Sequence, residues 1–230
     1  MLGEGAGMVL LKPLAAAEAD GDRIYAVLKA VSVNNDGRTA GPASPNLAAH
    51  KRLLEQTLRR SGLAAADIGH IEANGSGTAM TDLLELKAIS AVYGGAARRC
   101  SLGSVKPNIG HPLCAEGIAA LIKVVLMLHH RQGVPFLSGQ VPLPHFALAD
   151  SPFFFHRATA ALDGALPAAA LNCFADGGTN VHAILQAWHA GALARRAPLT
   201  PPQRRPAAPQ PQPGGNIWKR YSTQESLENA

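Results

Sequence analysis

The sequence is poor in cysteine and lacks the features of a secreted or membrane protein. Cys100, Cys114 and Cys173 form no CxxC pair and no metal-ligand spacing, and their odd number argues against a disulfide scaffold. The N-terminus has no basic leader, and the most apolar predicted helix, 118–128, is interrupted by Lys123. We therefore expect a reduced, cytoplasmic protein that binds no metal and crosses no membrane.

Charge is unevenly distributed along the 230 residues, whose formal net charge is +5. Much of the basic excess lies in the C-terminal tail, which indicates a basic tail and not a nucleic-acid-binding face. A contact between this tail and an acidic partner protein or RNA stays an alternative. The hydrophobic content of 47% is enough to bury a core. The basic tail residues are Arg195, Arg196, Arg204, Arg205, Lys219 and Arg220.

Apolar runs of strand and helix type alternate along the chain, which favours an α/β layered fold over a helical bundle or a sandwich. Two β-rich runs, 7–12 and 23–34, are expected to be neighbouring strands joined by a short surface connection. Asn46 and Gly62 are typical of the two ends of a helix. Its expected buried face contains Leu47, Leu53, Leu54, Thr57 and Leu58. The other predicted strands are 68–74, 100–105, 152–156, 169–173 and 181–188, and the other helices are 81–94 and 114–133.

Composition also divides the chain. Residues 1–190 have the pattern of a folded domain, whereas 191–216 are rich in Pro, Gln and Arg and predict an extended, disordered linker. The last segment, 217–230, has too few apolar residues to fold alone, and we interpret it as a short docking element.

Four glycine-containing turns follow one another: GEGAG at 3–7, NGSGT at 74–78, GSVKPNIGH at 103–111 and DGGTNVH at 176–182. Each alone is a weak signal, because glycine at a strand end often only permits a positive φ. In this order they resemble the C-terminal half of a β-ketoacyl synthase from a modular polyketide synthase, with the pattern GEGAG, HGTGT, GSVKxNIGH and GGTNxH. The opening residues and NNDGRTAGPASPN at 34–46 resemble the trans-acyltransferase type of these ketosynthases.

The resemblance implies the C-terminal half of a thiolase-like, layered αβαβα fold that dimerises. It also implies acyl groups carried on the phosphopantetheine of an acyl carrier protein, with no cofactor bound directly. In the family a cysteine takes the acyl chain as a thioester. Two histidines then hydrogen-bond the thioester carbonyl of malonyl carrier protein and stabilise the enolate formed by decarboxylation.

Mapping the family motifs places Lys106, Asn108 and His111 on the second histidine loop, with His111 as an oxyanion donor and Lys106 as an anchor of the local charges. Asn74 stands where the first histidine is expected. The resemblance makes Phe174 a gatekeeper of the acyl pocket. The further substrate-binding positions that it implies are Thr78, Asn108, Gly177 and Gly178.

Asn74 changes the expected chemistry. Its amide can donate a hydrogen bond but exchanges no proton near neutral pH, and its reach differs from that of an imidazole. Loss of one oxyanion donor typically costs about 10²- to 10³-fold in rate. Asn74 therefore indicates a non-elongating ketosynthase, which passes the acyl chain onward without extending it. An alternative is a permuted form of the Cys, His and Asn set of ketosynthase III.

The family's nucleophilic cysteine lies upstream of GEGAG and has no counterpart in this chain. Cys114, near a predicted helix start, is a candidate thiol, although a small buried residue is the simpler interpretation. HPLCAEG replaces the usual HLEAAAG, so Leu113 stands where a carboxylate is expected, and whether Glu116 substitutes for it is open. Asp176 adds a carboxylate that would oppose an enolate unless it faces solvent.

We therefore expect half of a split ketosynthase, completed by an N-terminal half on another polypeptide and binding an acyl carrier protein. Whether it is an enzyme stays open. One alternative is an active synthase when paired with that half, and another is a carrier-protein-binding scaffold without catalysis. A fragment from a broken reading frame is a third.

Overall fold

The computed structural model describes residues 1–41, 43–96, 99–137, 145–162 and 168–188, all in one unit of the chain, Met1–Leu193. The linker predicted at 191–216 and the docking element predicted at 217–230 lie outside the described residues, so both stay predictions.

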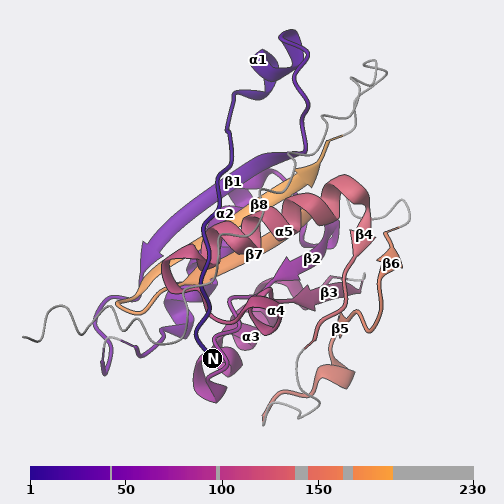
Figure 1. Ribbon diagram of the computed structural model, residues 1–230. Coiled ribbons are helices and arrows are strands. Elements are labelled where there is room, and N and C mark those ends of the chain that lie inside the picture. The colour runs from indigo at the N-terminus through magenta and orange to yellow at the C-terminus, as the bar shows by residue number, and fades with distance from the viewer. Residues whose placement is uncertain (42, 97–98, 138–144, 163–167, 189–230) are drawn as a thin grey trace, which may run out of the picture. The chain divides into compact units, whose positions relative to one another are not determined.

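A six-stranded mixed sheet forms the centre of this unit, in the order β1-β8-β7-β2-β3-β5 (Figure 1). β1, β8 and β7 pair antiparallel, whereas β7, β2, β3 and β5 run parallel. The strands of this sheet are β1 (Ala26–Asn35), β2 (Ile68–Glu72), β3 (Cys100–Gly103), β5 (Phe153–Phe155), β7 (Ala168–Phe174) and β8 (Thr179–Ala187); β4 (Gln132–Gly133) pairs separately with β6 (Ala160–Ala161).

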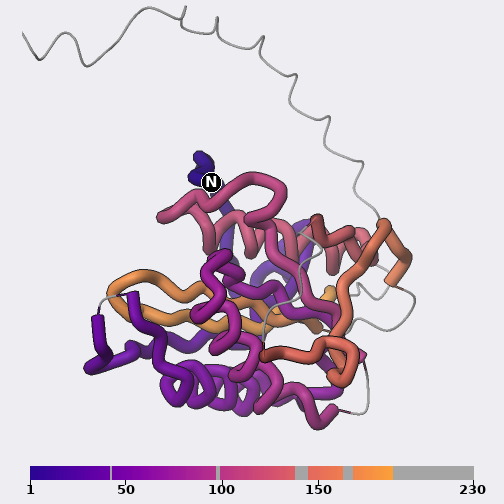
Figure 2. Tube along the Cα trace, turned by 90° about the horizontal axis from the view of Figure 1, so that it is seen from below, coloured from indigo at the N-terminus to yellow at the C-terminus, as the bar shows by residue number. Residues whose placement is uncertain are grey.

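Helices cover both faces of the sheet (Figures 1 and 2). α2 and α3 pack on one face, where Ala168 and Ala170 of β7 point, and α5 packs on the other, where Ala169 and Leu171 point. Because successive strand residues face opposite ways, a strand covered on both sides is apolar throughout. The helices are α1 (Leu14–Ala19), α2 (Leu47–Ser61), α3 (Ala79–Tyr93), α4 (Lys106–Ile109) and α5 (Glu116–His130), with short 3-10 turns at Ala65–Asp67, Leu113–Ala115 and Leu148–Asp150.

The predicted ends of the helix α2 are confirmed. The Asn46 side chain accepts hydrogen bonds from the N–H groups of Ala48 and Ala49, and Gly62 ends the helix with a φ of 72°. Such a cap typically contributes about 1 kcal/mol to stability. Of the expected buried face, Leu53, Leu54 and Thr57 are buried, and Leu47 and Leu58 are partly buried.

The prediction of a strand at 7–12 is wrong. These residues form no strand, and the side chains of Met8, Leu10 and Leu11 are exposed. The expected surface connection after them contains the helix α1, which stands away from the sheet in Figure 1. A strand needs a partner with unpaired backbone groups, and among the described residues 7–12 pair with no strand. The backbone before this run bonds to the His111 loop, where Gly3 N–H donates to the carbonyl of His111 at 3.0 Å.

The segment Leu113–His130 is long and apolar enough to span a membrane by length and composition, with a mean hydropathy of 1.6. In this fold its main part, α5, is a core helix on the sheet. Val124 and Leu128 are buried against Ala169 and Leu185 of the central strands. One side of α5 therefore packs on the sheet, whereas Leu126 is exposed and 28% of the segment is buried.

Candidate active site

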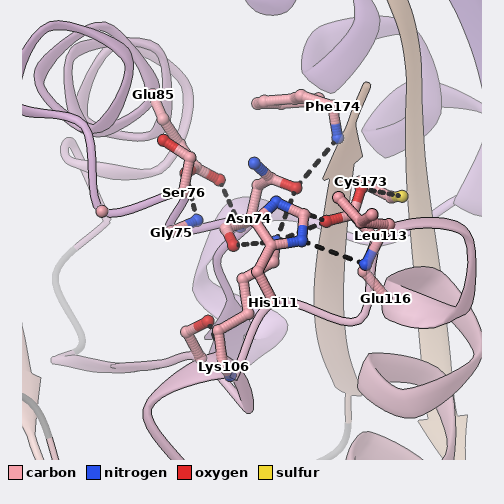
Figure 3. Close-up of polar contacts among 12 residues, drawn as sticks. Asn74, Gly75, Ser76, Glu85, Lys106, His111, Leu113, Glu116, Cys173 and Phe174 are labelled. Atoms are coloured by element: carbon pink, nitrogen blue, oxygen red, sulfur yellow. Dashed lines mark hydrogen bonds and ion pairs between the residues drawn. The ribbon is translucent and has the colours of Figure 1, made fainter. Parts of the chain in front are cut away.

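Three of the sequence motifs meet at one edge of the sheet (Figure 3). Asn74 follows β2, the loop that carries Lys106 and His111 follows β3, and Phe174 ends β7. These strands are parallel, so their carboxyl ends lie at the same edge, where α/β proteins commonly bind ligands. The sheet therefore brings together residues that are far apart in the sequence.

Asn74 is buried, and both its backbone and its side chain are bound by neighbours. Its N–H donates to Glu85 Oε1 at 2.7 Å, and the N–H of Gly75 donates to Glu85 Oε2 at 2.9 Å. Its side-chain oxygen accepts one hydrogen bond from Lys106 Nζ and another from the N–H of Phe174, each at 3.1 Å. The side-chain oxygen of Asn74 therefore already accepts two hydrogen bonds from the protein, and the amide nitrogen is the part that can donate to a ligand.

Glu85 fixes the turn at Asn74 and belongs to a chain of buried polar groups. It also accepts from Asn172 Nδ2 at 2.8 Å, and Asn172 Oδ1 lies 2.6 Å from His182 Nδ1. His182 Nε2 lies 2.8 Å from the Tyr93 hydroxyl. Burial raises the pKa of Glu85 and lowers the pKa of His182 to about 3, so His182 is neutral. These contacts indicate that Glu85 positions the backbone of the turn at Asn74.

Lys106 joins Asn74 to a second carboxylate, Glu116. Its Nζ lies 2.7 Å from Glu116 Oε2 and also donates to the backbone carbonyl of Asn74. Glu116 is the first residue of α5, where a carboxylate also suits the helix dipole. The thiol of Cys173 donates to its other oxygen at 3.3 Å. The sequence left the role of Glu116 open, and the structure places it at the centre of the motif loops.

His111 lies beside Glu116, with its ring 31% exposed. Its Nδ1 accepts a hydrogen bond from the N–H of Leu113 at 3.2 Å, which places the ring proton on Nε2 in the neutral form. That Nε2 lies 3.5 Å from Glu116 Oε2. Leu113 itself is exposed and has a positive φ of 48°, so it leaves the place of the usual carboxylate to Glu116.

Phe174, the predicted gatekeeper, is half-buried and stacks on His50 of α2, with 4.1 Å between ring centroids. Burial lowers the pKa of His50, although the Asp36 carboxylate acts in the opposite direction. The stacking holds the Phe174 backbone, whose N–H is bound to Asn74, at the rim of the cluster.

Of the other predicted substrate-binding residues, three are exposed and one is buried. Thr78 is the exposed N-cap residue of α3, and Asn108 is exposed on α4. Gly177 is exposed, whereas Gly178 is buried with a φ of 82° and packs on Asp36. Asp176 is exposed, so its carboxylate faces solvent and not the site.

The cysteines occupy three different environments. Burial, and next the nearby Glu116, raise the pKa of Cys173 to about 12, so this thiol is a poor nucleophile. Cys114 is exposed in the turn before α5, so the interpretation of it as a small buried residue is wrong. Cys100 opens β3 as predicted and is buried.

Fold and motif loops together define the class of the protein. The family model described as the C-terminal domain of beta-ketoacyl synthase matches residues 25–140. The chain therefore belongs to the β-ketoacyl synthase family, and its predicted thiolase-like fold is confirmed.

Its relatives narrow the class to polyketide synthases. PksL of Bacillus subtilis strain 168 is 56% identical over 206 residues, which are 88% of this chain and 4% of PksL. The oxazolomycin ketosynthase domain OzmH KS8 of Streptomyces albus JA3453 has a TM-score of 0.74 and 56% identity over 81% of this chain and 53% of that chain. The ketosynthase from module 6 of the Bacillus subtilis 168 bacillaene synthase has a TM-score of 0.74 and 32% identity over 78% of this chain and 34% of that chain. The chain is thus similar to the C-terminal region of polyketide synthase ketosynthases and spans a small part of the curated relatives.

Proposed function

We propose that this region belongs to a non-elongating ketosynthase of a trans-acyltransferase polyketide synthase, which passes an acyl chain between carrier proteins without condensation. The proposal is carried by Asn74, which we infer takes the place of the family's first histidine and whose side-chain oxygen is bound by Lys106 and Phe174. The residues at 34–46 and the similarity to PksL support the assembly-line type.

Condensation is the step that Asn74 opposes. Decarboxylation of a malonyl thioester leaves a negative charge on the carbonyl oxygen, and this charge needs fixed hydrogen-bond donors. With its oxygen facing Lys106 and Phe174, Asn74 offers one amide nitrogen at a reach and direction unlike those of a histidine ring. Loss of one such donor costs about 10²- to 10³-fold in rate, which is enough to silence extension.

Acyl transfer forms no enolate and so does not depend on the enolate stabilisation that condensation needs. A cysteine thiolate attacks the thioester on one carrier protein, and the phosphopantetheine leaves as a thiolate; a second phosphopantetheine thiolate then takes the acyl group and releases the cysteine thiolate. The cysteine of this proposal is the family's nucleophile in the N-terminal half of the ketosynthase; the thiol of Cys173, which has a raised pKa and donates to Glu116, is a poor substitute for it. The acyl groups arrive on carrier proteins, and no other cofactor is part of the proposal.

The N-terminal segment offers a surface for that second half. Met8, Leu10 and Leu11 are exposed, and an open apolar cavity of about 550 Å³ lies between Gly5–Gly7 and α5. Exposed apolar surface of this kind marks an interface. We propose that the N-terminal half of the ketosynthase covers it within a dimeric ketosynthase.

Co-expression of the two halves as separate chains tests this assignment. We expect a complex on size exclusion, which Leu10→Asp with Leu11→Asp weakens and Glu55→Gln on α2 leaves unchanged. The complex should move an acyl group from one carrier protein to a second, as intact-protein masses would show. Absence of a complex would contradict the proposed interface between the two halves, and a complex that moves no acyl group would contradict the transfer function.

A further inference from the structure

The first glycine motif, GEGAG at 3–7, begins against the loop that carries His111. Leu2 and His111 form a parallel β-bridge. The N–H of His111 donates to the carbonyl of Met1 at 3.1 Å, and the N–H of Gly3 donates to the carbonyl of His111 at 3.0 Å. Residues 1–3 therefore bind both polar backbone groups of His111, and the backbone cannot turn there without loss of a hydrogen bond.

Two glycines make this close approach possible. A Cβ on Gly3 would lie 2.2 Å from the carbonyl oxygen of Ile109 and 3.1 Å from the carbonyl carbon of Gly110. A Cβ on Gly110, whose φ is 77°, would lie 3.0 Å from the nitrogen of Gly3 and 3.0 Å from the carbonyl oxygen of Leu2. Because all these neighbours are backbone atoms, no side-chain rotation could relieve the contact. The motifs GEGAG and NIGH thus meet through their backbones.

The ring of His111 is fixed by the loop on its other side (Figure 3). The N–H of Leu113 donates to Nδ1 at 3.2 Å, which leaves Nε2 as the donor of the neutral ring. The ring is 31% exposed and is therefore open to a ligand. A shift of the His111 backbone would carry Nε2 with it, and a misplacement of about 1 Å can cost about 10²-fold in rate.

We propose that residues 1–3 position His111 and that Gly3 is the positioning residue, because it alone of the three must lack a side chain to reach the loop. Gly3 acts through the backbone of His111 and is not itself catalytic. The inference rests on the proposed function, because it takes His111 as a hydrogen-bond donor to the thioester carbonyl of an acyl group. The same segment continues to the exposed apolar residues at 8–11, so one stretch of chain serves both His111 and the proposed interface.

Chemical labelling of histidine tests this positioning without any turnover. Diethyl pyrocarbonate attacks the unprotonated ring nitrogen, which in His111 is the Nδ1 that Leu113 N–H binds. On the assembled ketosynthase, Gly3→Ala should speed the labelling of His111 by at least about 5-fold, measured from peptide masses, because a displaced loop frees Nδ1. His50 and His182 are buried and should be labelled at the wild-type rate, because only a general loss of structure would expose them.

Gly95→Ala is the matched control, since a Cβ on Gly95 would have no atom within 4 Å. It should leave the labelling of His111 unchanged. Equal labelling of His111 in Gly3→Ala and Gly95→Ala would overturn the inference. A Gly3→Ala variant in which the two buried histidines are labelled as fast as His111 would also overturn it, because Gly3 would then serve stability alone.

Hydrogen exchange of the wild type gives a second test that needs no variant to fold. The amide of His111, which donates to Met1, should exchange at least about 10-fold more slowly than the same amide in an unstructured peptide. Exchange at the rate of the unstructured peptide would show that residues 1–3 do not hold His111, and the inference would fail.

Extension assays separate this inference from the proposed function. Asn74→His should restore extension, and Gly3→Ala in that background should lower extension by about 10²-fold while it changes acyl loading by less than about 3-fold. A fall of both steps by the same factor would overturn the inference, because loss of folded protein lowers both. Asn74→His that extends no chain would contradict the role given to Asn74 in the proposed function, and the labelling of His111 would then decide the inference.

Discussion

Removal of the Lys106 charge should destabilise the site strongly, because Lys106 is the cation between Asn74 and Glu116. Its side chain is 9% exposed and that of Glu116 is 10% exposed, so water replaces little of the lost interaction. Removing one partner of a buried ion pair leaves an unpaired charge and typically costs about 3–5 kcal/mol. Lys106→Met should therefore lower the free energy of unfolding by about that amount, measured by urea denaturation of the assembled ketosynthase with circular dichroism.

A double variant separates the charge from the packing. Lys106→Met with Glu116→Leu removes both charges, so it should recover at least about 2 kcal/mol relative to Lys106→Met alone. Lys87→Met, at an exposed position of α3, should change stability by less than about 0.5 kcal/mol. The reasoning would be refuted by a cost below about 1 kcal/mol for Lys106→Met, or by a double variant that recovers nothing.

Two further predictions concern the other buried charges and thiols. Lys123→Met should cost about 3–5 kcal/mol, because Lys123 Nζ lies 2.6 Å from the fully buried Glu72. Burial alone would raise the pKa of Glu72, but His70 and Lys123 outweigh burial, and the net shift of the pKa is downward. The stabilisation by this carboxylate is therefore complete above its ordinary pKa of 4.5 and is lost as the pH falls. Unfolding curves recorded from neutral to acidic pH check this, and a stability that rises on acidification in wild type but not in Lys123→Met would contradict it. At about pH 8 iodoacetamide should modify the exposed Cys114 and spare Cys173, whose pKa is raised to about 12; peptide masses report this, and equal modification of both would show that Cys173 is more accessible than the structure implies.

The sequence was sufficient to predict structural features whose physical cause lies within a few residues. Asn46 and Gly62 delimit α2 because a side-chain cap and a positive φ act within a few residues. The edge that gathers Asn74 and His111 was also predictable, since each follows an apolar run that ends in a glycine-containing turn. The residues of these motifs are therefore enough to predict which edge of the sheet they share.

Features that depend on distant partners could not be predicted in this way. The run at 7–12 has the composition of a strand, but it has no strand partner among the described residues, so it forms no strand and Met8 and Leu10 are exposed. The position of Glu116 depends on the loop before α5, where the positive φ of Leu113 turns that side chain outward. Neither outcome can be inferred from residue type alone.

The central claim is that the assembled ketosynthase accepts an acyl chain and does not extend it. The direct measurement is the intact mass of each protein after the ketosynthase has been incubated with an acylated carrier protein and then with malonyl carrier protein. We predict a mass shift on the N-terminal half that carries the cysteine, and no extended acyl chain on the malonyl carrier protein. An extended product would show that Asn74 is a working oxyanion donor and would contradict the account.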